Sequence, residues 1–303
     1  MIKEEFVEYL RALDVVVRPE EPMSLHTSFR IGGAVDCFCE VPTLEALKKV
    51  LKRCREEAIP YRVIGLGSNL LVDDEGLSGI VIKLTGDFDA IEPVGETSLR
   101  CGAGVSLAGA CIAAKNRSLS GLEFAWGIPG SVGGAVYMNA GAYGGEMKDV
   151  VVSSRYLDEN GEVGELVGAD HAFTYRRSAY TDSPRIILDV TLQLTPGSKN
   201  EIFFRMQENM DKRKNKQPTN RPSAGSVFKR PQGYYAAALI EECGLKGKTM
   251  GGAQVSEKHS GFIVNNGGAT ARDVKELVEY VRRTVLEKTG VTLECEIKFW
   301  PEG

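Results

Sequence analysis

The chain has 303 residues, of which 43% are hydrophobic and 26% are charged, with 34 glycines and a formal net charge of −4. This composition is that of a globular protein with two or three compact units, and it excludes a disordered tail or a fibre. The acidic balance argues against a general nucleic-acid binder, which usually carries a basic surface stripe.

The N-terminal segment MIKEEFVEYLRAL alternates charged and apolar residues at helical spacing and lacks the hydrophobic stretch of a signal peptide. No apolar run elsewhere approaches membrane-spanning length, so we expect a cytoplasmic protein without a membrane span. The seven cysteines form an odd set without a CxxC pair, and the three histidines are scattered. We therefore expect reduced, mostly buried cysteines and no metal site.

The predicted elements alternate between helices and strands. Thr43 is expected to cap a helix whose apolar stripe is formed by Leu44, Leu47, Leu51 and Cys54. Two buried strands, 61–67 and 79–85, are expected next, which predicts one small βαβ-like unit. Short strands dominate from residue 97 to residue 194, with a hairpin at 158–161 and an alternating strand at 185–194.

The segment Thr195-Pro196-Gly197 predicts a domain boundary. Beyond it, apolar periodicity predicts helices at 201–214 and 273–288. The chain then closes on an expected strand at 292–300, in which Leu293, Cys295, Ile297 and Phe299 face one side. The sequence as a whole predicts a mixed class of fold.

Two uncharged glycine-rich stretches stand out. GLGSNLL (65–71) follows a predicted strand, and GIPGSVGGAVYMNAGAYGG fills residues 127–145. Backbone N–H groups in such turns bind anions, and the absence of Cβ lets the chain approach a ligand closely. Neither stretch is a Walker loop or a complete GxGxxG, which disfavours a Rossmann fold. The glycines either mark tight turns between short strands or, as the two stretches together favour, hold a dinucleotide.

Further motifs follow in a fixed order over nearly the whole chain. They are HTSFRIGGA (26–34), the two glycine-rich stretches, YRRS (175–178), SAGSVFKRP (223–231), LIEECGLKG (239–247), GGAQVSEKHSGFIVN (251–265) and LECEIKF (293–299). Together they resemble the UDP-N-acetylenolpyruvoylglucosamine reductases of peptidoglycan synthesis, also called UDP-N-acetylmuramate dehydrogenases. The resemblance implies an NADPH-dependent, FAD-mediated reduction of the small-molecule substrate UDP-N-acetylglucosamine enolpyruvate to UDP-N-acetylmuramate. We expect the protein to be a monomer.

The resemblance also implies an α+β fold. An FAD-binding domain of the vanillyl-alcohol oxidase-like type is expected at 1–195, with subdomains at about 1–85 and 86–195, and an α+β substrate domain is expected at 196–303. The implied FAD-binding residues are Arg30, Ile31, Gly32, Gly33, Gly65, Leu66, Gly67, Ser68, Asn69, Gly127, Ile128, Pro129, Gly130, Ser131, Gly133 and Gly134.

The reaction needs a hydride from flavin N5, a proton donor and stabilisation of an enolate. By resemblance, Ser226 donates the proton, and Arg176 and Glu296 stabilise the enolate, with Glu296 also helping to hold Arg176. Each residue has a plainer interpretation. Ser226 can be a residue of a Gly-Ser turn, the arginines of YRRS can be solvated, and Glu296 can lie on the wet face of an amphipathic strand.

The resemblance implies that the substrate is bound by Tyr175, Lys216, Lys229, Arg230 and His259. The basic residues 212–214 are instead expected to be solvated partners of a helix C-terminus, and a lone histidine is ordinarily a structural residue. Arg230 departs from the family, because some relatives have asparagine there.

Only eight residues, Arg177–Pro184, lie between Arg176 and the next expected strand, so we expect the tyrosine lid loop of longer relatives to be absent, and the shorter subtype is implied. Two rival functions stay open: a flavin oxidase of the same fold, and a non-catalytic nucleotide sensor. Neither glycine-rich stretch contains a histidine for covalent flavin attachment, which disfavours the oxidase. A sensor gives no reason for Ser226, Arg176 and Glu296 to match together.

Overall fold

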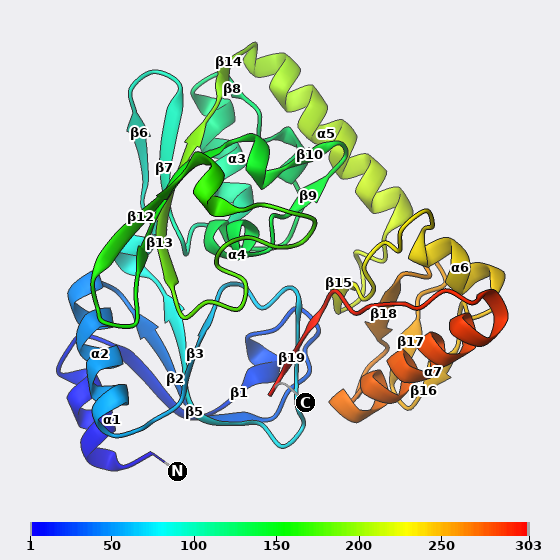
Figure 1. Ribbon diagram of the computed structural model, residues 1–303, viewed down its shortest axis with the longest axis horizontal. Coiled ribbons are helices and arrows are strands. Elements are labelled where there is room, and N and C mark those ends of the chain that lie inside the picture. The colour runs from blue at the N-terminus through cyan, green and yellow to red at the C-terminus, as the bar shows by residue number, and fades with distance from the viewer. Residues whose placement is uncertain (1, 302–303) are drawn as a thin grey trace. The chain divides into compact units, whose positions relative to one another are not determined.

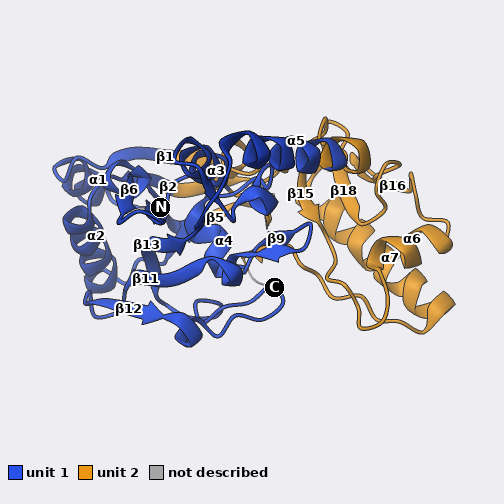
Figure 2. Cartoon of the chain, turned by 90° about the horizontal axis from the view of Figure 1, so that it is seen from above, with its two compact units in different colours: residues 1–19, 37–66, 79–212 blue, residues 20–36, 67–78, 213–303 orange. Residues whose placement is uncertain are grey.

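The computed structural model describes residues 2–301 (Figure 1). Contacts divide the chain into two compact units, coloured separately in Figure 2. Unit 1 comprises Met1–Pro19, Cys37–Leu66 and Gly79–Lys212, and unit 2 comprises Glu20–Asp36, Gly67–Ser78 and Arg213–Gly303. These units are built from interleaved segments, unlike the continuous ranges 1–195 and 196–303 expected from the sequence. The assignment of FAD and substrate to those two ranges stays a prediction.

The helices include those expected after Thr43, at 201–214 and at 273–288, and three that were not predicted, at 107–116, 132–137 and 236–242. They are α1 Glu4–Arg11, α2 Leu44–Glu56, α3 Leu107–Asn116, α4 Val132–Tyr137, α5 Lys199–Lys216, α6 Ala236–Glu242 and α7 Ala271–Thr289, with 3-10 turns η1 Met23–Leu25, η2 Gly86–Asp89, η3 Glu123–Ala125, η4 Met147–Asp149 and η5 Gly168–His171. The predicted cap of α2 is confirmed, because Thr43 Oγ1 accepts the N–H of Ala46 at 3.1 Å. Helix α7 begins two residues earlier than expected because Thr270 and Asp273 form a reciprocal capping box.

Two main sheets lie wholly or mostly in unit 1. The first has the order β1-β2-β5-β3 and the second has the order β12-β11-β13-β7-β6. Their strands are β1 Val16–Pro22, β2 Ala34–Val41, β3 Tyr61–Ile64, β5 Leu77–Leu84, β6 Ile91–Val94, β7 Ser98–Gly102, β11 Val151–Leu157, β12 Val163–Val167 and β13 Ile186–Gln193. Strands β3 and β5 are parallel, as the predicted βαβ-like unit requires, and β11 and β12 form the predicted hairpin.

Short strand pairs complete this unit. They are β8 Leu119–Ser120 with β14 Thr195–Pro196, and β9 Gly141–Ala142 with β10 Gly145–Glu146. Because Thr195 and Pro196 pair with β8, the chain is still part of unit 1 at the boundary expected from the sequence. The apolar stripe of α2, with Leu47, Leu51 and Cys54, is buried in the hydrophobic core of this unit.

Unit 2 is built on the antiparallel sheet β15-β18-β17-β16. Its strands are β15 Ser223–Ser226, β16 Thr249–Met250, β17 Ala253–Val255 and β18 Phe262–Asn265, and β4 Leu70–Val72 pairs in parallel with β19 Lys298–Trp300. Helix α7 contacts β16 and β17. Its buried face, with Val274, Leu277 and Val281, fills the core of the unit.

The closing strand predicted at 292–300 is wrong in length, because only Lys298–Trp300 is a strand. Residues 294–296 exchange backbone hydrogen bonds with 227–229, whereas residues 298–300 pair with β4. The segment therefore changes partners between 296 and 298 and cannot form one ladder. The alternation of its side chains is right, since Leu293 and Ile297 are buried while Glu294 is exposed.

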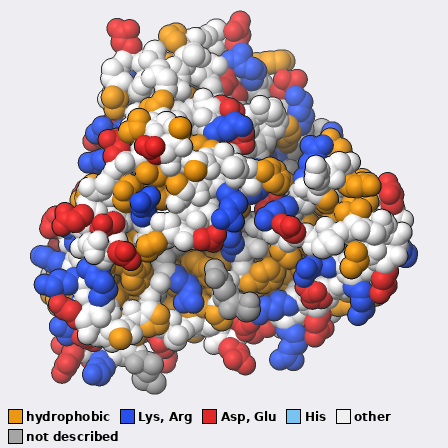
Figure 3. Space-filling view, in the orientation of Figure 1, with side chains coloured by type: hydrophobic (Ala, Val, Ile, Leu, Met, Phe, Trp, Pro, Cys, Tyr) orange, Lys and Arg blue, Asp and Glu red, His pale blue; other side chains and the backbone are white. Residues whose placement is uncertain are grey.

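Three further observations bear on what we expected from the sequence. In the part of the chain that the structure describes, none of the seven cysteines takes part in a disulfide, and six are buried, as expected of mostly buried cysteines. Within residues 2–301, no helix combines the length and the apolar character needed to cross a membrane. Acidic and basic side chains are interspersed over the face shown in Figure 3.

Candidate active site

The two glycine-rich stretches meet in unit 1. Gly65 follows β3, and Ser131 caps α4, where its Oγ accepts the N–H of Gly134 at 3.2 Å. A Cβ added at Gly65 would lie 2.5 Å from Ser131 Oγ. Any side chain at position 65 would therefore displace this cap, and the structure brings together two segments that the sequence could only pair by analogy.

At several glycine positions, neighbouring atoms of the protein leave no room for a side chain. A Cβ at Gly133 would lie 2.8 Å from Ala103 Cβ, and one at Gly145 would lie 2.7 Å from the Phe124 ring. Within unit 2, a Cβ added at Gly67 would lie 2.1 Å from the carbonyl oxygen of His26. At these positions the tight-turn interpretation of the glycines is sufficient.

Gly134 differs from these glycines. It lies on an exposed side of α4, and an added Cβ would have Ser131 Oγ as its nearest neighbour, at an ordinary 3.4 Å. Internal packing therefore does not require glycine at position 134, so this position stays a prediction for close approach of a ligand.

Among the other predicted cofactor residues, Leu66 and residues 127–130 belong to unit 1, whereas residues 30–33 and 67–69 belong to unit 2. Arg30 adopts a left-handed φ of 55°, and Ile31 is buried. Gly67 accepts the N–H of Ser28 at 3.1 Å, and Asn69 Nδ2 donates to the carbonyl of Glu296 at 3.1 Å. The predicted FAD residues are thus divided between the units, and one of them is bonded to the backbone of a predicted catalytic residue.

Arg176 lies at the tip of a tight turn in unit 1. Thr174 and Arg177 exchange backbone hydrogen bonds of 3.0 and 3.3 Å, and Arg176 has a left-handed φ of 58°. Its guanidinium carbon lies 5.1 Å from the centre of the half-exposed Tyr175 ring. Arg177 instead forms a 2.8 Å ion pair with Asp182. The two arginines of YRRS therefore have different environments.

Ser226 and Glu296 lie on bonded segments of unit 2. Ser226 ends β15, opposite Phe262, and its Oγ donates to the carbonyl of Phe228 at 3.2 Å. The N–H of Glu296 donates to the carbonyl of Val227 at 2.7 Å. The backbones of the two predicted catalytic residues are therefore held in register.

His259 lies near Ser226. A Cβ added at Gly261 would be 3.1 Å from His259 Cε1 and 3.4 Å from Ser226 Oγ, so both side chains flank this glycine. The N–H of Gly261 donates to His259 Nδ1 at 3.2 Å, which leaves the proton of the neutral ring on Nε2. Burial lowers the pKa of His259 below its usual 6.5. His259 is thus a neutral hydrogen-bond donor at pH 7.

The predicted nucleotide-binding cations are also in unit 2. Lys216 ends α5 and is exposed. Lys229 Nζ lies 3.2 Å from Glu294 Oε2, and Arg230 stacks 3.9 Å from the centre of the Tyr235 ring. The expectation that residues 212–214 are all solvated is wrong for Arg213, which is 8% exposed and donates to Gln217.

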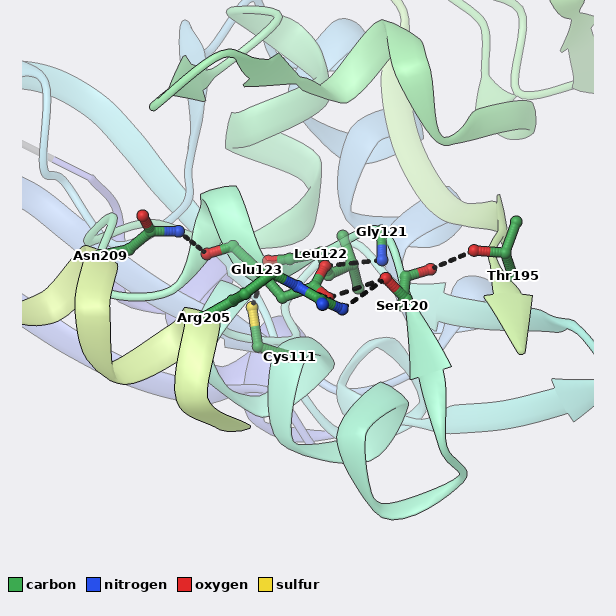
Figure 4. Close-up of polar contacts among 8 residues, drawn as sticks. All are labelled: Cys111, Ser120, Gly121, Leu122, Glu123, Thr195, Arg205 and Asn209. Atoms are coloured by element: carbon green, nitrogen blue, oxygen red, sulfur yellow. Dashed lines mark hydrogen bonds and ion pairs between the residues drawn. The ribbon is translucent and has the colours of Figure 1, made fainter. Parts of the chain in front are cut away.

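A polar cluster that the sequence did not reveal supports the loop before GIPG (Figure 4). Glu123 is 9% exposed, and its carboxylate accepts hydrogen bonds from Ser120 Oγ, the N–H of Gly121 and Arg205 of α5, at 2.8, 2.7 and 2.6 Å. Asn209 Nδ2 donates to the Glu123 carbonyl at 2.9 Å. The cluster attaches α5 to the loop that leads into residues 127–134. A glutamate before a glycine-rich stretch was the only sequence signal.

Glu123→Gln is expected to destabilise the protein at pH 7 by about 1–3 kcal/mol, because a buried hydrogen-bonding group loses its charged partner. Burial alone would raise the pKa of Glu123, but the hydrogen bonds from Arg205, Gly121 and Ser120 outweigh it and lower the pKa below the usual 4.5. The carboxylate's contribution is therefore complete above pH 4.5 and is lost as the pH falls through the lowered pKa. The difference between parent and variant should shrink in the same window.

Urea unfolding at several pH values measures this difference in free energy. Glu208→Gln is the matched control, because Glu208 lies on α5, the helix of Arg205, but is half-exposed and pairs with Lys212 at 3.5 Å. It should change stability by less than about 0.5 kcal/mol. Equal stability of Glu123→Gln and the parent at pH 7 would contradict the supporting role of the cluster.

Comparison with known proteins identifies the family. The FAD binding domain profile matches residues 35–166, and the profile of the UDP-N-acetylenolpyruvoylglucosamine reductase C-terminal domain matches residues 217–300. The UDP-N-acetylenolpyruvoylglucosamine reductase of Clostridioides difficile is 45% identical over 298 residues, which cover 97% of this chain and 98% of that protein. The chain belongs to the UDP-N-acetylenolpyruvoylglucosamine reductases.

Other members of the family agree. The enzyme of Caldanaerobacter subterraneus is 48% identical over 278 residues, covering 92% of this chain and 91% of that protein. The crystal structure of the reductase from Thermus caldophilus superposes with a TM-score of 0.81 at 40% identity, covering 95% of this chain and 99% of that one. The resemblance inferred from the motifs and the α+β class are confirmed. The chain is an FAD-binding oxidoreductase that reduces UDP-N-acetylenolpyruvoylglucosamine in peptidoglycan synthesis.

The residues present fit FAD. Gly134 offers open backbone on α4, beside the point where Gly65 packs against Ser131. A dinucleotide needs such uncovered backbone, and side chains at these positions would obstruct it. The individual contacts to the cofactor stay predictions.

Proposed function

We propose that Ser226, Arg176 and Glu296 carry the reduction of the enolpyruvyl group in this chain. Bound FAD supplies the hydride, and NADPH is the proposed source of reducing equivalents. The observation that best supports the proposal is the 2.7 Å hydrogen bond from Glu296 N–H to the Val227 carbonyl, which holds the segment of Glu296 beside Ser226.

Ser226 is the proposed proton donor. A serine hydroxyl is a weak acid, so it needs a fixed position and a strongly basic acceptor carbon. Its backbone is fixed by pairing with Phe262, and its Oγ makes only a 3.2 Å bond to the Phe228 carbonyl. Redirecting this long bond toward a substrate carbon costs little, which suits a group that must release its proton.

Arg176 and Glu296 are proposed to stabilise the charge that develops next to the substrate carboxylate. A guanidinium is always charged and presents a planar fork that matches a carboxylate. Of the two arginines, the family motif selects Arg176, and Arg177 forms an ion pair with Asp182. Glu296 is proposed to stabilise the enol form, with its backbone held by Asn69 and Val227.

The proposed substrate-binding residues are those implied by the motifs: Tyr175, Lys216, Lys229, Arg230 and His259. Lys216 is exposed and suits a diphosphate. To bind the substrate, Lys229 must give up its ion pair with Glu294. His259 presents a neutral Nε2–H donor for the nucleotide.

We also propose that the enzyme is a cytoplasmic monomer of the shorter subtype. Its substrate and NADPH are cytoplasmic nucleotides, which supports the location. Only eight residues, Arg177–Pro184, lie between Arg176 and the strand expected from residue 185. Within this segment, Asp182 forms an ion pair with Arg177. This leaves little chain for a tyrosine lid.

The test is a rapid-mixing experiment on the purified holoenzyme. Its absorption should show oxidised flavin, NADPH should bleach it, and UDP-N-acetylenolpyruvoylglucosamine should restore the colour faster than air does. Faster recovery with oxygen than with the enolpyruvyl sugar would indicate an oxidase. A colourless protein that takes up no FAD would contradict the proposal.

His259→Ala is expected to raise the KM for the UDP-sugar about fivefold at pH 7.5 without changing kcat, as for one hydrogen bond of about 1 kcal/mol. Because burial lowers the pKa of His259, the parent KM should stay constant down to pH 6.5 and rise only below it. Protonation of Nδ1 would then break its bond with Gly261, and the variant should lack this rise. Initial-rate kinetics measure both effects. The exposed neighbour Glu257, changed to glutamine, serves as the control, and an unchanged KM in His259→Ala would return His259 to a structural role.

A further inference from the structure

Asn139 is a buried polar residue that the proposed reaction does not use. It follows α4 in the stretch MNAGAYGG, has no exposed surface and adopts a left-handed φ of 43°. Its Nδ2 donates to Glu146 Oε2 at 2.9 Å and to the Thr174 carbonyl at 3.0 Å, while its Oδ1 accepts the N–H of Lys148 at 3.0 Å. The side chain therefore makes three hydrogen bonds, and one of them reaches the turn that carries Arg176.

A second set of hydrogen bonds joins the same two segments. Ser178 Oγ and Thr181 Oγ1 both donate to the carbonyl of Tyr137, the last residue of α4, at 2.9 and 3.1 Å. The end of α4 thus contacts the YRRS turn at Thr174 on one side and at Ser178 on the other. Since α4 begins at Ser131 and contains Gly134, one short helix connects the proposed FAD contact with the proposed catalytic turn.

The turn needs this support because of its backbone. Arg176 has a φ of 58°, a conformation that side chains other than glycine, asparagine and aspartate rarely adopt. Such a conformation persists only when surrounding contacts hold it. The Thr174 carbonyl that Asn139 binds also accepts the N–H of Arg177. Asn139 therefore binds the same carbonyl whose hydrogen bond closes the turn.

We propose that Asn139 is a positioning residue that holds the Arg176 turn in place relative to α4. The inference rests on the proposed role of Arg176 in the reaction. An amide is suited to this position because it donates two hydrogen bonds and accepts one from the same planar group. A carboxylate could keep the bond from Lys148 but could not donate to Thr174, and it would face the carboxylate of Glu146.

The experiment compares the two half-reactions of the flavin-loaded enzyme in a stopped-flow instrument. In Asn139→Ala and Asn139→Asp, reoxidation by UDP-N-acetylenolpyruvoylglucosamine should slow by about 10²-fold, as for a displaced catalytic group. Reduction by NADPH and the FAD content should stay within about twofold of the parent, because Arg176 has no part in them. Asn139→Asp keeps the volume of the side chain and covers the case in which alanine prevents folding.

A double variant shows whether Asn139 acts through Arg176. Asn139→Ala combined with Arg176→Ala should reoxidise at the same rate as Arg176→Ala alone, because the first change has nothing left to misplace. Gln193→Ala is the control, since Gln193 Nε2 also donates to a backbone carbonyl of unit 1, that of Leu194 at 3.0 Å, away from the turn. Both of its half-reactions should match the parent.

Three results would overturn the inference. Reoxidation at the parent rate in Asn139→Asp would show that the bond to Thr174 is unnecessary. Multiplicative losses in the double variant, or equal slowing of both half-reactions, would show that Asn139 does not act through Arg176. If Arg176→Ala reoxidises at the parent rate, both the proposed role of Arg176 and this inference are wrong. The results for the Asn139 variants contradict only this inference and leave the proposed role of Arg176 intact.

Discussion

Alanine at position 226 is expected to slow reoxidation of the reduced holoenzyme by its UDP-sugar substrate by about 10²–10⁴-fold, the usual effect of losing a positioned general acid. Reduction of the flavin by NADPH should proceed at close to the parent rate, because that half of the reaction takes no proton from Ser226. Ser226 pairs with Phe262 through its backbone, and Gly225 supplies the left-handed φ of 79° that the turn requires. Removing one hydroxyl therefore leaves the local structure intact.

Stopped-flow absorbance measures the two half-reactions separately. Ser223→Ala is the matched control, because Ser223 begins the same strand and pairs with Val264, three residues from the proposed donor. It should leave both rates unchanged. Ser226→Cys should recover part of the lost rate, since a thiol also donates a proton. Equal slowing of both halves in Ser226→Ala, or of neither, would make Ser226 a turn residue.

Valine at position 134 is expected to produce folded protein that contains little or no FAD. The structure leaves room for a side chain there, with only Ser131 Oγ at 3.4 Å from an added Cβ, so the apoprotein should tolerate the change. A ligand that approaches the bare backbone would not, and overpacking of about 1–3 kcal/mol corresponds to a loss of affinity of up to about 100-fold. Gly134→Ala should show a smaller loss.

The flavin content of the purified variants and titration with FAD measure the effect. Helix α3 provides the matched control, because Ser106 caps it and accepts the N–H of Gly109 at 3.0 Å, as Ser131 does for Gly134. The N-terminus of α3 is joined to the second glycine-rich stretch by the bond from Leu107 N–H to the Gly130 carbonyl, but Gly109 is not itself a predicted cofactor contact. Gly109→Ala therefore tests the effect of a Cβ at the same capping position and should retain FAD. Normal flavin content in Gly134→Val would mean that no ligand approaches this turn of α4. Gly133 is unsuitable for the test, since its Cβ would already collide with Ala103.

Much of the local structure could be predicted because its causes lie within a few residues. Thr43 caps α2 by bonding to Ala46, and the apolar stripe of α7 follows from helical spacing alone. The closing strand was predicted too long because its alternation is a local property, whereas its pairing depends on two different partners, 227–229 and β4. Alternation therefore predicted which side chains are buried without predicting the extent of the strand.

The site residues were assigned differently. The motif YRRS contains two adjacent arginines, and nothing within the four letters distinguishes them. The structure does, because Arg177 pairs with Asp182 while Arg176 occupies the left-handed tip of the turn. The glycines show the same limit. Gly133 has no room for a Cβ beside Ala103, whereas Gly134 has room for one, and the sequence does not distinguish the two positions.

The sequence by itself determined the family, the α+β class and the helices α2, α5 and α7, through ordered motifs, apolar periodicity and caps that act over four residues or fewer. Only the tertiary structure decided which polar groups meet: Asn139 binds Thr174 across 35 residues, Arg205 binds Glu123 across 82, and Asn69 binds Glu296 across 227. The physical reason is that a buried polar group must find a partner wherever the fold provides one, and sequence distance places no limit on that choice.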